Sequence, residues 1–111
     1  MMAKYLLIES RDSYEFGDVG YFCGMAKDLA AAGNDVTLFL LQNGVLMARK
    51  GAETPARSLL TSESKVRVLA DAFCLRERGI PESALLPGVK VGDVDALVDL
   101  LATQDVKAVW H

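Results

Sequence analysis

Short apolar runs alternate with helical patterns along this chain, and this alternation constrains its fold more than any other feature. Each run is flanked by polar residues, which is typical of a strand covered on both faces of a sheet. Strand–helix–strand repeats predict an α/β fold with a parallel or mostly parallel sheet between two helical layers. The expected strands are 4–8, 36–41, 66–70 and 106–110, with a minor strand at 89–91, and the expected helices are 18–33, 72–78 and a segment that begins at 93.

Capping and turn residues mark the ends of these elements. Asp18 is expected to cap the first helix, and Gly33 suits the left-handed conformation that ends it. Gly79 is expected to end the second helix in the same way. Between the second and third strands we expect a short helix at 45–50, which Pro55 prevents from continuing. Leu59-Leu60 is expected to pack this segment against the sheet.

Size and composition indicate one globular domain over residues 1–111, because 51% of the side chains are hydrophobic and 24% are charged. The net charge of −3 offers no basic surface for a phosphate backbone, which argues against nucleic acid as a partner. The apolar runs are far shorter than the ~20 residues of a membrane-spanning helix, and the run after Lys4 is too short for a signal peptide. We therefore expect a cytoplasmic protein, with reduced thiols and no membrane partner.

The sequence lacks the motifs of the common cofactor sites. The turn after the first apolar run reads ESRDSYEFGDVG, and its glycines do not have the G-x-G-x-x-G spacing of a dinucleotide site. The phosphate-binding loop is also absent, since Lys50-Gly51 reverses its order. One histidine and two distant cysteines provide no paired metal ligands. We therefore expect a Rossmann-like topology with neither a cofactor nor a metal.

In such a sheet, ligand-binding and catalytic residues lie at the carboxyl ends of the strands. In this chain that edge is expected to contain Glu9–Ser13, Gln42–Val45, Ala70–Cys74 and His111. Because terminal residues are often mobile, a solvated end is the plainer interpretation of His111, ahead of a catalytic role.

The two cysteines differ in their setting. Cys23 falls on the apolar side of the first helix, which indicates a buried, inert thiol. Cys74 would occupy the third position of a helix capped by Asp71, where the helix dipole favours a thiolate by about 0.3–1 kcal/mol. Arg78 would act in the same direction and the Asp71 carboxylate in the opposite one. Since these effects nearly cancel, the local sequence alone establishes no activated thiol.

Four segments together resemble the DsrE/DsrF-like family, which includes the TusD-type sulfur-relay subunits: FLLQNGV, LRERGI, LPGVKVGDVDALVDLL and the closing VKAVW. The resemblance implies a three-layer α/β/α fold with a five-stranded sheet and assembly into trimers or hexamers. In active members it implies a cysteine just after the third strand that carries a persulfide. In this alignment the relay position falls on Asp71, and Cys74 lies one helical turn beyond it. The loop at Asn43-Gly44 would then line the pocket, with Trp110 and His111 nearby.

Two functions follow from the resemblance. In the first, Cys74 is a shifted nucleophile that relays sulfur, as a sulfurtransferase would, between carrier proteins of intracellular sulfur metabolism. In the second, the protein is a non-catalytic homo-oligomeric module, in which Asp71 selects a cationic or hydrogen-bond-donating ligand. An exposed Cys74 facing Arg78 would favour the first function, and a buried Cys74 the second.

Plainer structural roles remain open for the same residues. Asp71 could simply cap its helix, which is worth ~0.5–2 kcal/mol, and Arg78 could be a solvated helix end. Asn43-Gly44 could be a turn without further function. A purely structural oligomer is a third class, and its contacts would come from any of Tyr21, Phe22, Met47 and Leu59 that prove exposed.

Overall fold

The computed structural model describes residues 2–51, 53–60 and 64–111, and at its centre lies a five-stranded sheet with the order β4-β3-β2-β1-β5. The strands are β1 Lys4–Glu9, β2 Asp35–Leu40, β3 Arg67–Asp71, β4 Lys90–Gly92 and β5 Val106–Trp110. Every neighbouring pair is parallel. The predicted mostly parallel sheet is therefore confirmed, and it is entirely parallel.

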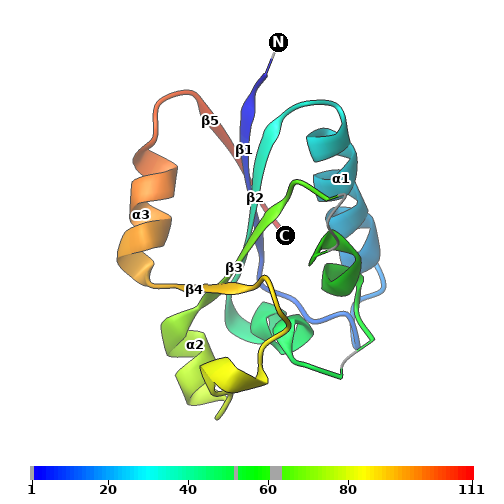
Figure 1. Cartoon of the computed structure of the whole chain (residues 1–111). Coiled ribbons are helices and arrows are strands. Elements are labelled where there is room, and N and C mark those ends of the chain that lie inside the picture. The colour runs from blue at the N-terminus through cyan, green and yellow to red at the C-terminus, as the bar shows by residue number, and fades with distance from the viewer. Residues whose placement is uncertain (1, 52, 61–63) are drawn as a thin grey trace.

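Helices cover both faces of the sheet and so form three layers (Figure 1). The α-helix α1 (Val19–Ala31) lies on one face and α3 (Val94–Ala102) on the other, while α2 (Ala72–Glu77) lies beyond the carboxyl ends of the strands. Within the described ranges, three 3-10 helices complete the fold, η1 (Gln42–Ala48), η2 (Pro55–Leu60) and η3 (Glu82–Ala84). Among the described residues, none of the helices has the length and apolar character that a membrane span requires.

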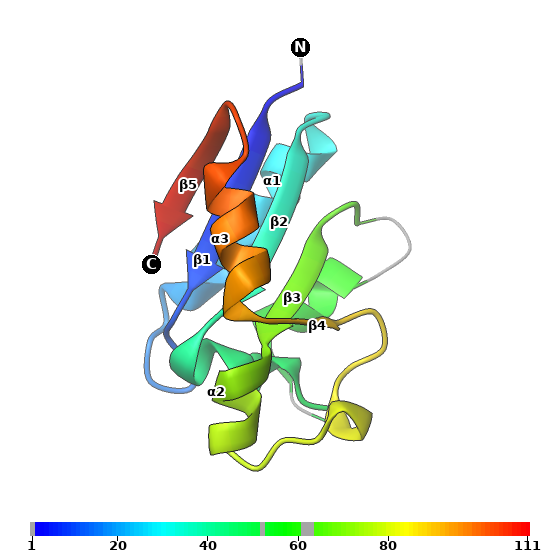
Figure 2. The same cartoon turned by 90° about the vertical axis from the view of Figure 1, so that its left-hand side faces the viewer.

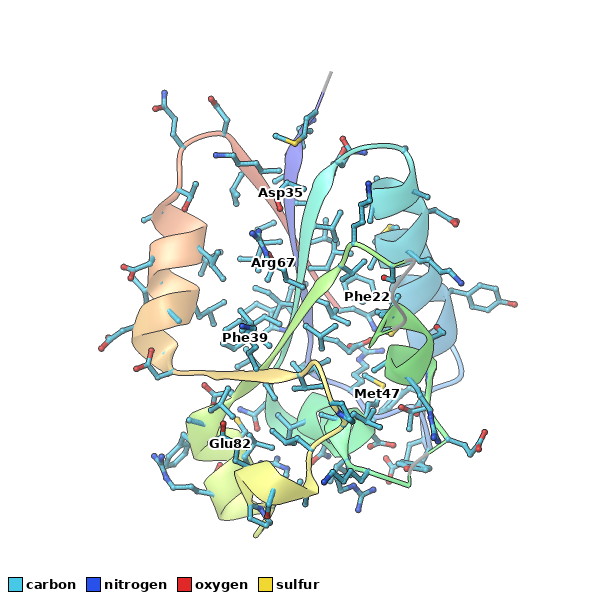
Figure 3. All side chains as sticks on the ribbon, viewed as in Figure 1. Phe22, Asp35, Phe39, Met47, Arg67 and Glu82 are labelled. Atoms are coloured by element: carbon cyan, nitrogen blue, oxygen red, sulfur yellow. The ribbon has the colours of Figure 1, made fainter. Side chains whose placement is uncertain are left out.

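The two faces of the sheet are covered unequally. On the α1 side a large core includes Leu7, Leu38 and Met47, together with apolar side chains of α1 and η2. On the α3 side Leu6, Ile8 and Phe39 form a smaller cluster, against which half-buried leucines of α3 pack. Figure 3 shows Phe39 on the α3 side of the sheet and Met47 on the other side. No described side chain of α3 is buried, so this layer is thin.

Several predicted boundaries need correction. Asp18 occupies the N-cap position of α1, as predicted, but its side chain makes no capping hydrogen bond. The short helix expected over 45–50 is a 3-10 helix that begins earlier, at Gln42. Pro55 starts η2, a position that its fixed φ suits. Leu59 is buried as expected, whereas the side chain of Leu60 lies outside the described part of the chain.

Candidate functional site

The carboxyl edge of the sheet holds two separate groups of polar side chains. We call the first the corner, and it comprises Gln42, Asn43, Asp71, Cys74 and Arg78, at the ends of β2 and β3. We call the second the histidine cluster, and it comprises Glu9, Asp18, Phe22 and His111, at the ends of β1 and β5. The sequence predicted this edge as the functional one.

Asp71 ends β3 and caps α2. Its Oδ2 accepts a hydrogen bond of 2.9 Å from the backbone N–H of Cys74, which confirms the predicted cap. The side chain is almost completely covered, since Asp71 is only 2% exposed. Its second oxygen, Oδ1, has no hydrogen-bond partner among the described residues. A buried acceptor without a donor is costly, so this oxygen is the unusual feature of the corner.

Cys74 lies inside the corner and is 4% exposed. Its Sγ accepts the backbone N–H of Gln42 at 3.2 Å, and Gln42 adopts a left-handed φ of 51°. Burial raises the pKa of the Cys74 thiol, and the Asp71 carboxylate raises it further. The Gln42 N–H and Arg78 lower it, but they do not reverse the shift. The local sequence shows the opposed effects of Asp71 and Arg78, but burial, which it does not show, is the largest effect and favours the protonated thiol.

Arg78 joins α2 to η1. Its Nε and Nη2 donate to Asn43 Oδ1 at 3.1 and 3.0 Å, and its Nη1 donates to the carbonyl oxygen of Cys74 at 3.1 Å. The interpretation of Arg78 as a solvated helix end is therefore wrong. Asn43 is likewise more than a turn residue, because its side chain holds the guanidinium.

Gly44 allows the backbone of η1 to pack closely against the end of β1. A Cβ at this position would overlap the carbonyl oxygen of Glu9, so only glycine fits here without a shift of the backbone. That same carbonyl accepts the N–H of Leu41 at 2.9 Å. Gly44 thus fixes the approach of η1 to the end of β1.

His111 is held between two carboxylates. Its Nδ1 lies 2.7 and 3.0 Å from the two oxygens of Glu9, and its Nε2 lies 2.9 Å from Asp18 Oδ2. The ring also stacks on Phe22, with 5.1 Å between the ring centroids. Because each ring nitrogen faces a carboxylate oxygen, this geometry favours the imidazolium form, in which both nitrogens donate. The interpretation of His111 as a solvated end is therefore wrong.

The charges of the histidine cluster stabilise one another. The hydrogen bond to Glu9, followed by that to Asp18, raises the pKa of His111. The hydrogen bond to His111 lowers the pKa of Asp18. Glu9 is fully buried, so the imidazolium supplies the positive charge that a buried carboxylate needs. The sequence signal for this pair was an acidic residue at the end of an apolar strand.

The expected proximity of His111 and Trp110 to Cys74 is not observed. β1 and β2 lie between β3 and β5, which at ordinary strand spacing separates the two strand ends by about 14 Å. Within the described ranges no hydrogen bond or ring contact joins the histidine cluster to the corner. Trp110 instead donates its indole N–H to Ser10 Oγ at 3.2 Å.

A pocket of about 360 Å³ lies beside Asp71, between the first residues of α2 and those of α3. The starts of these two helices lie near each other at the β3–β4 side of the sheet (Figure 2). We call it the acidic pocket, and its lining residues are Asp71, Ala72, Phe73, Arg76, Asp93, Val94 and Asp95. Three aspartates and one arginine are therefore among its lining residues. Asn43 and Gly44, which were expected to line the pocket, do not line this one.

Cys23 and most of the residues considered for an oligomer contact are buried. Cys23 is buried, and burial together with the charge of Glu9 raises its pKa to about 12, which fits the predicted inert thiol. Of the residues considered for a structural oligomer, Phe22, Met47 and Leu59 are buried, and Tyr21 is 85% exposed. Within the described ranges no group of three or more His, Cys, Asp or Glu side chains could hold a metal ion.

Comparison with known proteins agrees with this fold. The model of the DsrE/DsrF-like family matches residues 21–107. The structure of the YchN protein from E. coli is similar, with a TM-score of 0.82 and 22% identity over 97% of this chain and 100% of that chain. MTH1491 from Methanobacterium thermoautotrophicum, described as a protein of unknown function, has a TM-score of 0.78 and 19% identity, with 100% of both chains covered. No curated protein sequence matches this chain.

Proposed function

The chain belongs to the DsrE/DsrF-like family, and from this premise we propose that it is a binding module of sulfur metabolism whose corner recognises a cationic group through Asp71. Membership in the family supports the role in sulfur metabolism. The surroundings of Asp71 favour ligand binding, and those of Cys74 disfavour sulfur relay.

The observation that carries this proposal is the unpartnered Oδ1 of Asp71. A buried acceptor left without a donor destabilises the fold by about 1–3 kcal/mol, and more if it is charged. Within the described chain, the thiol of Cys74 is a neighbouring donor, but thiols are weak donors. A ligand with a strong N–H donor would remove this penalty on binding, so the free energy stored at Asp71 favours such a ligand.

The acidic pocket defines the class of ligand. Asp71 lines it together with Asp93 and Asp95, so the local charge favours a primary ammonium or guanidinium group. The ring of Phe73 lies at the same pocket, and the guanidinium of Arg76 stands 5.9 Å from its centroid, which is the geometry of a cation–π contact. A ligand cation could take the same place on that ring.

Cys74 is poorly suited to sulfur relay in this conformation. The attacking species in sulfur transfer is a thiolate, whereas burial and Asp71 raise the pKa of this thiol and so disfavour the thiolate.

A relay through Cys74 is the second candidate, and one contact favours it. The N–H of Gln42 points at Sγ and would stabilise a thiolate or a persulfide there. In such a step the thiolate attacks the outer sulfur of a donor R–S–SH, a Cys74 persulfide forms, and the donor leaves as its thiolate. A sulfur adduct that is present in the wild type and absent in Cys74→Ser would support this candidate.

Binding of small cations tests the first proposal. The probes are agmatine and ethylammonium at low salt, with acetate as an anionic control, and the readouts are calorimetry and the melting temperature. We expect agmatine to bind to the wild type and to raise its melting temperature. Asp71→Asn should abolish both effects, and it keeps the cap because asparagine caps helices well.

Asp99→Asn is the matched control, since it removes the same charge from α3 outside the acidic pocket. This variant should bind agmatine as the wild type does. Equal binding by Asp71→Asn and the wild type, with unchanged stability, would contradict the proposal.

A further inference from the structure

A further pocket lies beside the end of η1, and its lining is basic. Its volume is about 270 Å³, and its lining residues are Tyr14, Arg49, Lys50 and Gly51. We call it the basic pocket. It shares no lining residue with the corner, the histidine cluster or the acidic pocket. The loop after β1, which carries Tyr14, and the helix η1 both lie at the end of the molecule where the strands end (Figure 1).

Arg49 is a half-buried cation that has no carboxylate partner within the described structure. Its guanidinium donates to neutral groups, from Nε to the carbonyl oxygen of Leu46 at 3.0 Å and from Nη2 to the hydroxyl oxygen of Tyr14 at 3.4 Å. Arg78, which is also half-buried, differs because Glu77 Oε1 lies 3.7 Å from its Nη1. Because a cation that is partly withdrawn from water is stabilised by a nearby anion, Arg49 favours an anionic ligand.

The walls of the basic pocket are held in place by backbone hydrogen bonds. On one side, the segment 48–50 is fixed to the segment 84–86 by an antiparallel bridge centred on Arg49, whose two hydrogen bonds are both 2.7 Å long. On the other side, Asp12 Oδ1 accepts the backbone N–H of Tyr14 at 2.9 Å, which fixes the loop. The donors of the pocket are therefore largely in position before a ligand arrives, which favours binding.

Three side chains of the basic pocket have donors to offer. Within the described ranges, Arg49 Nη1 and Lys50 Nζ have no hydrogen-bond or ion-pair partner. The hydroxyl oxygen of Tyr14 accepts from Arg49, so the hydroxyl hydrogen is left for a ligand. A guanidinium fork, an ammonium group and a hydroxyl suit an anion with more than two oxygens, because they approach it from different directions.

We propose that the basic pocket binds a tetrahedral oxyanion, such as phosphate or sulfate, either as the free ion or as the end group of a small ligand. The net charge of the whole chain is −3, so an anion is attracted here only by the local cations. The volume is close to the ~300 Å³ at which small-molecule pockets begin, so the ligand is small. The site is independent of Asp71, which lies in the acidic pocket and would repel such a ligand.

Calorimetry tests this proposal. The probes are sodium sulfate and sodium phosphate, titrated at an ionic strength matched with sodium chloride, and sodium acetate is the anion with only two oxygens. We expect saturable one-to-one binding of sulfate and phosphate by the wild type, with acetate at least about fivefold weaker. Lys50→Gln should weaken the binding of sulfate at least about fivefold, because a charged donor is lost. Arg49→Lys keeps the charge but loses the guanidinium fork, so it should also bind sulfate more weakly.

Lys90→Gln is the matched control, because it removes the same charge from an exposed residue of β4 outside the basic pocket. This variant should bind sulfate as the wild type does, and circular dichroism will establish that all variants fold. Phenyl phosphate separates the two sources of the anion. Tighter binding of phenyl phosphate than of phosphate supports an end group of a larger ligand, and equal binding supports the free ion.

Three results would each overturn the proposal. The first is the absence of saturable binding of both sulfate and phosphate to the wild type. The second is equal binding of sulfate by Lys50→Gln and the wild type, or a loss in Lys90→Gln as large as that in Lys50→Gln. The third is binding of acetate as tight as that of sulfate, which would contradict a site for a tetrahedral anion.

Discussion

Replacement of His111 by alanine should destabilise the fold strongly, because it leaves the buried carboxylate of Glu9 without its counter-charge. Glu9 is fully buried, and apart from His111 its carboxylate accepts only the N–H of Arg11, at 3.2 Å, within the described structure. Removing one partner of a buried ion pair typically costs 3–5 kcal/mol. Since the Arg11 contact survives, we expect a loss near the lower limit, about 3 kcal/mol.

Urea unfolding at pH 7, followed by circular dichroism at one protein concentration, measures this loss. The double variant Glu9→Gln/His111→Ala is the comparison variant, because it also removes the negative charge of Glu9 that His111→Ala leaves unpaired. Its free energy of unfolding should exceed that of His111→Ala by about 1 kcal/mol or more. A loss below about 1 kcal/mol in His111→Ala, or a further loss in the double variant, would refute the reasoning.

Other predictions concern titration, packing and access. The raised pKa of His111 stabilises the fold below its ordinary value of about 6.5, and this stabilisation should be lost as the pH rises through the folded pKa, which NMR titration of this single histidine can follow. The lowered pKa of Asp18 has the opposite sign, so its stabilisation should be lost as the pH falls through the folded pKa. Gly44→Ala should lower the free energy of unfolding by about 1–3 kcal/mol, because its Cβ meets the Glu9 carbonyl, and a cost near zero would contradict the close approach. Cys74 should react with iodoacetamide several-fold faster in Arg78→Ala than in the wild type, because the link to Asn43 is lost, and equal rates would show that this link does not close the corner.

The fold could be predicted because its signals are local. The strands β1, β2, β3 and β5 are five or six residues long and each contains a short, mostly apolar run, and the glycines at 33 and 79 have the expected positive φ. Asp71 and Asp93 cap α2 and α3 through bonds to residues three positions on, a spacing that is visible in the sequence.

The candidate site was harder to predict because its contacts are distant in sequence. His111 and Glu9 are 102 positions apart, and only the pairing of β1 with β5 brings them together. Asp18 was assigned to a cap by a local rule, whereas its side chain binds His111 instead. The burial that raises the pKa of Cys74 cannot be predicted from the local sequence, because it depends on η1, which packs over this residue from another part of the chain.

Intact-mass measurement after incubation with a persulfide donor tests most directly whether the corner binds through Asp71 or carries sulfur on Cys74. We expect the wild type to keep its mass. Asp71→Cys, which puts a thiol where the family resemblance places the relay cysteine, should gain the mass of one sulfur atom. A sulfur adduct on the folded wild type that disappears in Cys74→Ser would contradict the binding function proposed for this corner.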